Sequence, residues 1–253
     1  MLRSLTRKLS TMSKEITRQA ELFQHLAAVE ESIVKECVAV GRPRTAVNLV
    51  AVSKYMPESD IQILYDAGHR DFGENYVQEL VRKAGTLPGD IRWHFIGALQ
   101  SNKCKVLAKI PNLSAVETVD SASKAQKLND NRTDNDSILG IFLQINTSGE
   151  DQKSGLAWDA TEEVLEVARA VTKFPRLQLR GLMTIGSFSE SHAEGVNSDF
   201  DRLSKLATTL QTELGVPIGL SMGMSSDFLE AIRQGSTNVR VGRTIFGNRP
   251  VKT

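Results

Sequence analysis

One lysine stands where it could form a covalent bond to a carbonyl compound. Lys54 directly follows the apolar run Leu49–Ser53. Burial beside apolar residues lowers the pKa of an amine, because desolvation disfavours the ammonium form, and the uncharged amine is the nucleophile that forms a Schiff base. A lysine in such a place is more often solvated or ion-paired. Lys54 alone is therefore only a candidate for this chemistry.

A second group of residues could bind an anion. Gly223 opens a loop after another apolar run, and Ser225, Ser226 and Asp227 follow and are expected to cap a helix. Backbone N–H groups at a helix start bind phosphate well, although ordinary capping by Ser and Asp gives the same pattern. A Schiff-base lysine paired with a phosphate site suggests pyridoxal 5′-phosphate (PLP). An aldolase-like enzyme that uses Lys54 without PLP is the alternative.

Short strand-like runs alternate with helical patterns along the chain. The expected strands are Leu49–Ser53, Arg70–Gly73, Arg92–Ile96, Ala115–Thr118, Leu139–Ile145, Gln178–Thr184, Ile218–Met222 and Asn238–Gly242. The clearest helical patterns are Thr161–Val171 and Phe200–Leu214. This alternation implies parallel strands joined by crossover helices, and 253 residues is a usual length for a single barrel. We therefore expect one α/β domain, a (β/α)₈ TIM-type barrel.

The first helix has a particular place in this barrel. Helical spacing predicts a helix over Ile16–Val38, with no strand before it, while only residues 243–253 follow the last expected strand. Those residues are too few for a long final helix, so we expect the N-terminal helix to complete the outer ring. Working groups of such barrels lie at the C-terminal ends of the strands. Lys54 and Ser225 should then share one mouth.

Residues 1–14 differ in composition from the rest of the chain. They contain Arg3, Arg7, Lys8 and Lys14, several Ser and Thr, and no acid before Glu15. This is typical of a mitochondrial presequence, and a short disordered leader is the other interpretation. We therefore take residues 15–253 as the barrel domain. The expected location is the cytoplasm, with the mitochondrion as the alternative.

Charge and composition argue against several other classes of protein. The net charge is +1 and no basic stripe appears, so no nucleic-acid partner is expected. No apolar run reaches the roughly 20 residues of a membrane helix. Cys37 and Cys104 have no metal-ligand spacing, so we expect two reduced thiols and no metal site. We expect a monomer.

Long stretches around these residues resemble the YggS/PROSC family of pyridoxal phosphate homeostasis proteins. The matching stretches are AVSKYMP (51–57), FGENYVQEL (72–80), WHFIGALQSNK (93–103), QINTSGEDQKSGL (144–156), GLMTIG (181–186), LSMGMSSDFLEAI (220–232), VRVG (239–242) and IFGNRP (245–250). They occur in order, span nearly everything after the leader, and are most similar to fungal members. The resemblance implies a barrel like the N-terminal domain of alanine racemase, with PLP bound inside.

The resemblance also implies roles for individual residues. Lys54 would carry PLP as a Schiff base, and Arg240 would face the pyridine nitrogen. A guanidinium stays protonated and donates a hydrogen bond, which leaves the ring nitrogen unprotonated and weakens the cofactor as an electron sink. Ser225, the neighbouring helix start and the backbone around Gly242 would hold the phosphate. The remaining members of the expected cofactor-binding set are Asn75, His94, Ser221 and Met224.

One position departs from the family pattern. Family members usually carry Ser or Thr directly after the glycine of the VRVG stretch, where this chain has Arg243. Either the Arg243 side chain supplies a charged contact to phosphate, or only its backbone N–H binds. Thr244 is not expected to replace the missing hydroxyl, because neighbouring side chains of a strand point to opposite faces.

Two functions of different class remain. The first is a PLP carrier that stores and delivers the cofactor, with transient contacts to apo PLP enzymes and no turnover of its own. The second is an amino-acid racemase or related enzyme, with His94 or Tyr55 as an additional base. Racemisation needs an acid/base group on each face of the α-carbon. In the racemases that this fold resembles, a C-terminal domain supplies one, and we do not expect that domain here. The carrier is therefore favoured.

Overall fold

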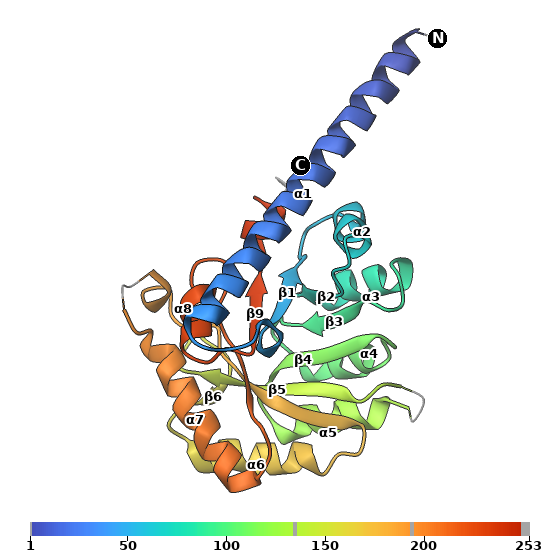
Figure 1. Ribbon diagram of the computed structural model, residues 1–253. Coiled ribbons are helices and arrows are strands. Elements are labelled where there is room, and N and C mark those ends of the chain that lie inside the picture. The colour runs from blue at the N-terminus through green and yellow to red at the C-terminus, as the bar shows by residue number, and fades with distance from the viewer. Residues whose placement is uncertain (1, 134–135, 193–194, 249–253) are drawn as a thin grey trace.

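The computed structural model describes residues 2–133, 136–192 and 195–248 of the chain, and they form a closed barrel ringed by helices (Figure 1). The strands are β1 (Asn48–Val52), β2 (Asp71–Glu74), β3 (Arg92–Phe95), β4 (Leu113–Val119), β5 (Leu139–Asn146), β6 (Leu156–Ala157), β7 (Leu177–Met183), β8 (Gly219–Ser221) and β9 (Asn238–Val241). All pairings are parallel, in the order β4-β3-β2-β1-β9-β8-β7-β5, and β4 pairs with β5 to close the circle. The predicted eight-stranded barrel is confirmed.

One short strand was not predicted. β6 extends the sheet beside the end of β5, where Ile145 lies opposite Leu156. It follows the loop 147–155, which returns over the C-terminal end of β5. Two residues are too few to produce a readable strand period, so the sequence alone could not reveal β6.

The helices cover the outside of the barrel. They are α1 (Leu2–Ala39), α2 (Glu58–Asp66), α3 (Val77–Thr86), α4 (Cys104–Ala108), α5 (Ala122–Asn131), α6 (Thr161–Thr172), α7 (Ser198–Leu214), α8 (Phe228–Arg233) and α9 (Arg243–Phe246). Local signals explain their ends. The Asn197 side chain accepts the N–H groups of Asp199 and Phe200 at the start of α7, and Gly215 ends that helix with a φ of 66°.

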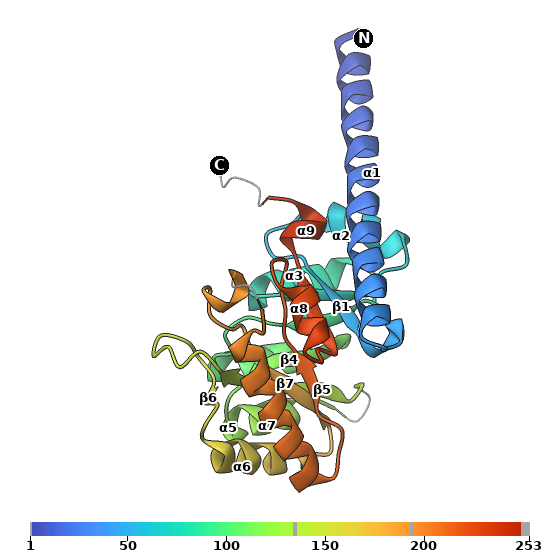
Figure 2. The same cartoon turned by 60° about the vertical axis from the view of Figure 1, so that its left-hand side comes forward.

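Helix α1 completes the ring, as predicted. It packs against α2, α8 and α9, and its N-terminal part extends away from the barrel (Figure 2). Arg18 joins the ends of the ring, because its guanidinium donates to Asp60 of α2 at 2.6 Å and to the carbonyl of Phe246 in α9 at 2.8 Å. The helix begins at Leu2 rather than near Ile16. The proposed domain start at residue 15 stays a prediction, and residue 1 lies outside the described residues.

The two faces of the strands differ in chemistry. Outward-facing residues pack with the helices into the main hydrophobic core; those of β1 and β9 are Leu49, Ala51, Val239 and Val241. Inside the barrel, a separate small apolar cluster is formed by Ala115, Phe142 and Met183. Many of the other inward positions are polar, among them His94, Glu117, Ser221, Asn238 and Arg240, all of them buried. No helix of the described ranges is long and apolar enough to cross a membrane.

Candidate functional site

Neighbouring strands carry most of the predicted site residues at one end of the barrel. β8, β9, β1 and β2 lie side by side in parallel, and Ala51 of β1 lies opposite Val241 of β9. Parallel strands end at the same edge of a sheet. This arc of the C-terminal mouth therefore brings together Ser225, Gly242, Lys54 and Asn75.

The turn that carries Lys54 has an unusual backbone. Lys54 is half-buried, and the next residue, Tyr55, has a φ of 67°. A bulky non-glycine residue in this left-handed region is strained and needs support from its surroundings. The support comes from α3, because the Glu79 carboxylate accepts the N–H of Tyr55 at 2.8 Å. The hydroxyl groups of Tyr55 and Tyr76 also form a hydrogen bond.

A set of buried, mostly charged side chains supports this turn from the outer face of the barrel. We call Ser53, Glu74, Glu79 and Lys83 the outer cluster, because it lies between the barrel wall and α3. The ammonium of Lys83, which is completely buried, donates to Glu74 at 2.7 Å and Glu79 at 2.8 Å. It also donates to the carbonyl of Ser53, the residue before Lys54, at 2.8 Å. Burial raises the pKa of Glu74, and the contact with Lys83 opposes that rise.

Arg240 lies inside the barrel on β9 and is 4% exposed. One terminal nitrogen, Nη1, donates to Ser221 Oγ at 2.6 Å, and the other, Nη2, donates to the carbonyl of Thr184 at 2.7 Å. Burial lowers the pKa of Arg240, while the charge of Glu117 opposes this effect. The guanidinium of Arg240 is therefore a buried cation near the barrel mouth, held by Ser221 and by the Thr184 carbonyl.

The contacts of Arg240 continue into a chain of polar groups. We call Asp71, His94, Glu117, Ser221, Asn238 and Arg240 the inner cluster. Glu117 Oε2 accepts from Ser221 at 2.5 Å, and Glu117 Oε1 contacts His94 Nδ1 at 2.6 Å. His94 Nε2 contacts Asp71 at 3.2 Å, and Arg92, which is largely exposed, binds Asp71 at the outer end. The chain thus runs from Arg240 through the barrel to its surface.

The charges of the inner cluster set the protonation of His94. Burial alone would lower the pKa of His94, but hydrogen bonds to Asp71 and Glu117 raise it to about 9. For Asp71 burial acts in the opposite sense, and contacts with His94 and Arg92 hold its pKa well below the usual range. His94 is therefore an imidazolium between two carboxylates. Its position on β3, opposite Gly73 of β2, puts it inside the barrel.

The predicted phosphate side lies where α9 begins. Ser225 Oγ accepts the N–H of Gly242 at 3.3 Å and that of Thr244 at 3.5 Å. Ser225 thus engages the N–H groups on either side of Arg243, and the N–H of Arg243, at the first position of α9, has no partner within the helix and can donate to an anion. The sequence argument about Thr244 was wrong in its reason, because Arg243–Phe246 is a helix and not a continued strand. The exposed side chain of Arg243 stands at its first position.

The loop after β8 holds its shape through one aspartate. Asp227 is the N-cap residue of α8, and its carboxylate accepts the N–H of Met224 at 2.6 Å. Met224 itself is half-buried. Gly223 has a φ of 94°, and a Cβ there would come within 2.9 Å of the backbone of Phe228. Only glycine fits this position, so the loop is fixed close to α8.

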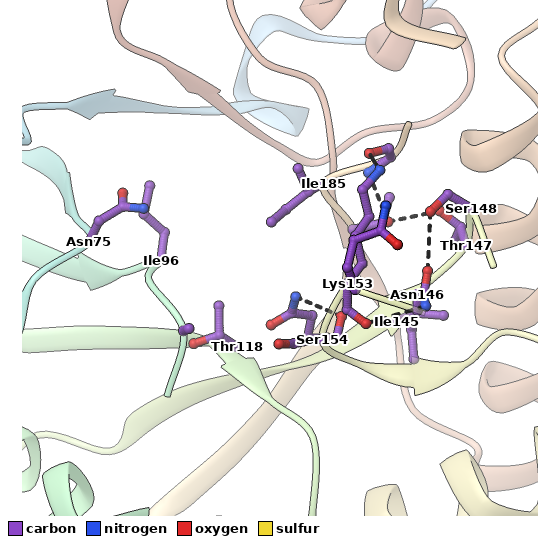
Figure 3. Close-up of a pocket in the computed structure, with 15 residues that line it drawn as sticks. Asn75, Ile96, Thr118, Ile145, Asn146, Thr147, Ser148, Lys153, Ser154 and Ile185 are labelled. Carbon is purple, nitrogen blue, oxygen red and sulfur yellow. Dashed lines mark hydrogen bonds between the residues drawn. The ribbon is translucent and has the colours of Figure 1, made fainter. Parts of the chain in front are cut away.

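A cavity of about 250 Å³ opens at the mouth beside this arc (Figure 3). It is lined by Asn75, Ile96, Ala98, Thr118, Gln144, Ile145, Asn146, Thr147, Ser148, Gln152, Lys153, Ser154, Thr184, Ile185 and Gly186. Asn75, a predicted site residue, lies on one side of it, and the loop after β5 lies on the other. The other predicted site residues are not among the lining residues, namely Lys54, His94, Ser221, Met224, Ser225, Arg240, Gly242 and Arg243.

Sequence reasoning missed Glu117 and Lys83, although each left a signal. Glu117 interrupts the apolar strand β4, where a carboxylate needs a buried partner. Lys83 occupies the buried face of α3 at the spacing of Val77 and Leu80. A charge at a core position indicates a buried ion pair, but nothing in the sequence names the partner.

The residues of this arc fit PLP. Asn75 Oδ1 is a buried acceptor with no hydrogen-bond partner among the described residues, and Asn75 lines the cavity. A Cβ at Gly242 would come within 3.2 Å of the Val52 carbonyl, so the backbone there is exceptionally close to β1. The buried guanidinium of Arg240 and the N–H groups of α9 supply donors for a ring nitrogen and a phosphate.

Comparison with known sequences points to one family. Residues 38–250 match the model of the alanine racemase N-terminal domain. A relative from Schizosaccharomyces pombe, called pyridoxal phosphate homeostasis protein, is 49% identical over 204 residues, which are 81% of this chain and 85% of the relative. A human protein of the same name is 44% identical over 236 residues, with 88% and 85% covered.

Solved structures agree with this result. PipY of Synechococcus elongatus, in a structure with PLP bound, is similar with a TM-score of 0.68 and 29% identity, over 85% of this chain and 100% of that chain. An alanine racemase from Clostridium difficile has a TM-score of 0.68 but 16% identity, over 92% of this chain and 58% of that chain. The second likeness concerns the fold alone.

Proposed function

This chain belongs to the family of the alanine racemase N-terminal domain, among the pyridoxal phosphate homeostasis proteins, and from this premise we propose that it binds PLP. The main observation that supports this proposal is the arc of neighbouring strand ends. It brings the half-buried Lys54, the buried guanidinium of Arg240 and the donors around Gly242 to one side of the barrel mouth.

Each part of the arc has a proposed role. Lys54 holds the cofactor covalently through its ε-amino group, and Arg240 donates to the pyridine nitrogen. The phosphate is bound by the Ser225 hydroxyl, by the N–H of Arg243 and by the N–H of Gly242, which is shared with Ser225 Oγ. The exposed side chain of Arg243 can add charge. Bound PLP supplies an electron-withdrawing ring, and hydrogen bonding from a guanidinium keeps that ring a weak electron sink.

The other predicted residues surround the ring in this proposal. Asn75 lies at its edge, because its carbonyl oxygen is a buried acceptor that lacks a protein partner in the described ranges. Met224 packs from the loop after β8. Ser221 and His94 would act through the inner cluster, in which both are buried and hydrogen-bonded.

We further propose that the protein stores and delivers PLP and does not turn over a substrate. The polar groups that line the cavity are mostly amides and hydroxyls, and the ammonium of Lys153 is held by Glu150 at 2.6 Å and by the Gly186 carbonyl at 2.7 Å. An amino-acid carboxylate would have to compete with Glu150 for that cation. His94, a candidate second base, is enclosed between two carboxylates. These features support a carrier over a racemase.

Borohydride reduction tests the binding proposal directly. Reduction of the PLP-saturated protein should add one pyridoxyl group to the tryptic peptide that contains Lys54. The internal control is Lys83, which is completely buried in an ion pair and should stay unmodified. A Lys54→Ala variant should lose the modification. Unmodified Lys54 in saturated wild-type protein would end the proposal.

Isotope exchange separates the carrier from the racemase. Amino acids that carry deuterium at the α-carbon should keep it in the presence of the PLP-loaded protein, as judged by NMR. Rapid washout would show that the protein labilises the α-proton, which requires an acid/base group near the ring.

The remaining expectations are part of the proposal. Residues 15–253 form the PLP-binding domain, and apo PLP enzymes are the transient partners. The protein works in the cytoplasm, with the mitochondrion as the alternative that the basic, Ser/Thr-rich residues 1–14 support. Fluorescent fusions with and without residues 1–14 test this, because the loss of a mitochondrial signal on truncation would identify a presequence.

A further inference from the structure

The hydroxyl of Ser221 has one possible orientation within the inner cluster. Its oxygen lies 2.6 Å from Arg240 Nη1, 3.0 Å from Asn238 Nδ2 and 2.5 Å from Glu117 Oε2. The first two groups can only donate hydrogen bonds, and together they use both lone pairs of the oxygen. The hydroxyl proton must therefore go to Glu117.

The orientation of Asn238 is fixed as well. Its Oδ1 accepts a hydrogen bond from Asn48 Nδ2 at 2.9 Å, so the other amide atom is the nitrogen that faces Ser221. The same nitrogen donates to Glu117 Oε1 at 3.1 Å. Reversing the amide would turn an acceptor towards Glu117 and break both contacts.

These contacts require an ionised Glu117. Its Oε1 faces the donors of His94 and Asn238, and its Oε2 faces the donor of Ser221. With His94 as an imidazolium, three donors face the two oxygens, and a proton on Oε1 or on the Ser221 side of Oε2 would meet one of them. Contacts from His94 hold the pKa of Glu117 below its usual value, against the effect of burial.

We propose that Glu117 is a positioning residue for PLP binding, which acts through the Ser221 hydroxyl to hold the guanidinium of Arg240 in place as a donor for the pyridine nitrogen. Glu117 Oε2 lies 4.0 Å from Arg240 Nη1, with Ser221 bridging the two. This inference rests on the proposed function. It gives Ser221 the task of orienting Arg240 rather than of contacting the cofactor.

The geometry explains why one bridge matters. Arg240 is anchored by one N–H of each terminal nitrogen, to Ser221 and to the Thr184 carbonyl, and a guanidinium carries five such donors. Two anchors on different nitrogens define the plane and the rotation of the group. Loss of the Ser221 anchor leaves a single contact, about which the guanidinium can turn.

The primary test is the variant Glu117→Gln. An amide has one donor and one acceptor end, so it cannot accept at both positions that Glu117 presents to His94, Asn238 and Ser221. We expect PLP to dissociate about tenfold faster from Glu117→Gln than from wild type, because a charge-assisted hydrogen bond is lost. The absorption spectrum of the bound cofactor should shift as well, since the donor at the ring nitrogen moves.

Further variants separate positioning from general stability. Ser221→Ala should accelerate release by a similar factor, and it tests the inference on its own should Glu117→Gln not fold. Ser236→Ala is the matched control, because Ser236 is equally buried and its hydroxyl donates to the Met222 carbonyl at 2.8 Å. It should leave the release rate and the spectrum unchanged.

A double-mutant cycle with Arg240→Lys tests whether Glu117 acts on PLP binding through Arg240. If Glu117 acts through Arg240, Glu117→Gln should have little further effect on release in the Arg240→Lys background. Full additivity would overturn the inference, as would wild-type release and spectrum in both Glu117→Gln and Ser221→Ala. A failure of the proposed function is a different result, namely wild-type protein that takes no pyridoxyl group on Lys54.

Discussion

The outer and inner clusters lie on opposite faces of the same barrel wall, and they are built differently. In the outer cluster one completely buried lysine serves two carboxylates and a backbone carbonyl. In the inner cluster, positive and negative groups alternate from Arg240, through the bridging Ser221 hydroxyl, to Glu117, His94 and Asp71. The outer cluster is sealed by α3, whereas the inner one reaches solvent at Arg92, whose side chain is 55% exposed.

The difference shows two ways in which buried charges can position a lysine or an arginine. The outer cluster acts on the main chain, since Lys83 holds the Ser53 carbonyl and Glu79 holds the N–H of Tyr55, on either side of Lys54. The inner cluster acts on a side chain, because the Ser221 hydroxyl of this cluster accepts a hydrogen bond from the guanidinium of Arg240. Contacts to the main chain thus fix the turn on both sides of Lys54, whereas contacts to the side chain fix the guanidinium of Arg240.

The largest expected effect is on the outer cluster. Lys83→Met removes the cation and leaves two carboxylates without it, so we expect a loss of about 3–5 kcal/mol in the free energy of unfolding. Urea denaturation of wild type and variant measures it. The control is Lys205→Met, which breaks the exposed pair with Asp201 and should cost less than about 1 kcal/mol. Equal losses of unfolding free energy in Lys83→Met and Lys205→Met would contradict the view that the outer cluster is a buried ion-pair network.

The inner cluster should give a pH dependence. The pKa of His94 is raised from 6.5 to about 9 in the folded state, so its stabilisation is complete below about pH 6.5 and is lost as pH rises through 9. We expect the free energy of unfolding to fall by roughly 3 kcal/mol over this window. His94→Gln should abolish that slope, and His25→Gln, at a partly buried histidine of α1, should retain it. A flat wild-type profile would show that His94 is not an imidazolium.

The smallest effect is expected at the solvent end of the inner cluster. Arg92→Ala removes a partner of Asp71, but the arginine is largely exposed and Asp71 keeps its contact with His94. The free energy of unfolding should fall by no more than about 1 kcal/mol. A loss as large as that of Lys83→Met would mean that the inner cluster is as sealed as the outer one.

Much of the barrel could be predicted from the sequence. Apolar runs bounded by turn residues gave strands close to the observed ones, such as Leu139–Ile145 against Leu139–Asn146 in β5. The prediction that the N-terminal helix completes the outer ring is confirmed, because α1 packs against α2, α8 and α9. Predicted ends were less accurate where a turn continues a strand, as at Gly242, because a helix start and a strand end share the same residues there.

The sequence by itself determined which cations stand at the barrel mouth. Lys54 follows β1 and Arg240 lies in β9, two strands that the residue pattern identifies, and parallel pairing brings their C-terminal ends together. Only the tertiary structure decided what holds them. Glu117 meets Ser221 across 104 residues of chain, and it does so because both side chains point into the same closed barrel. That contact depends on the stagger of strands around the circle, which no local pattern of residues encodes.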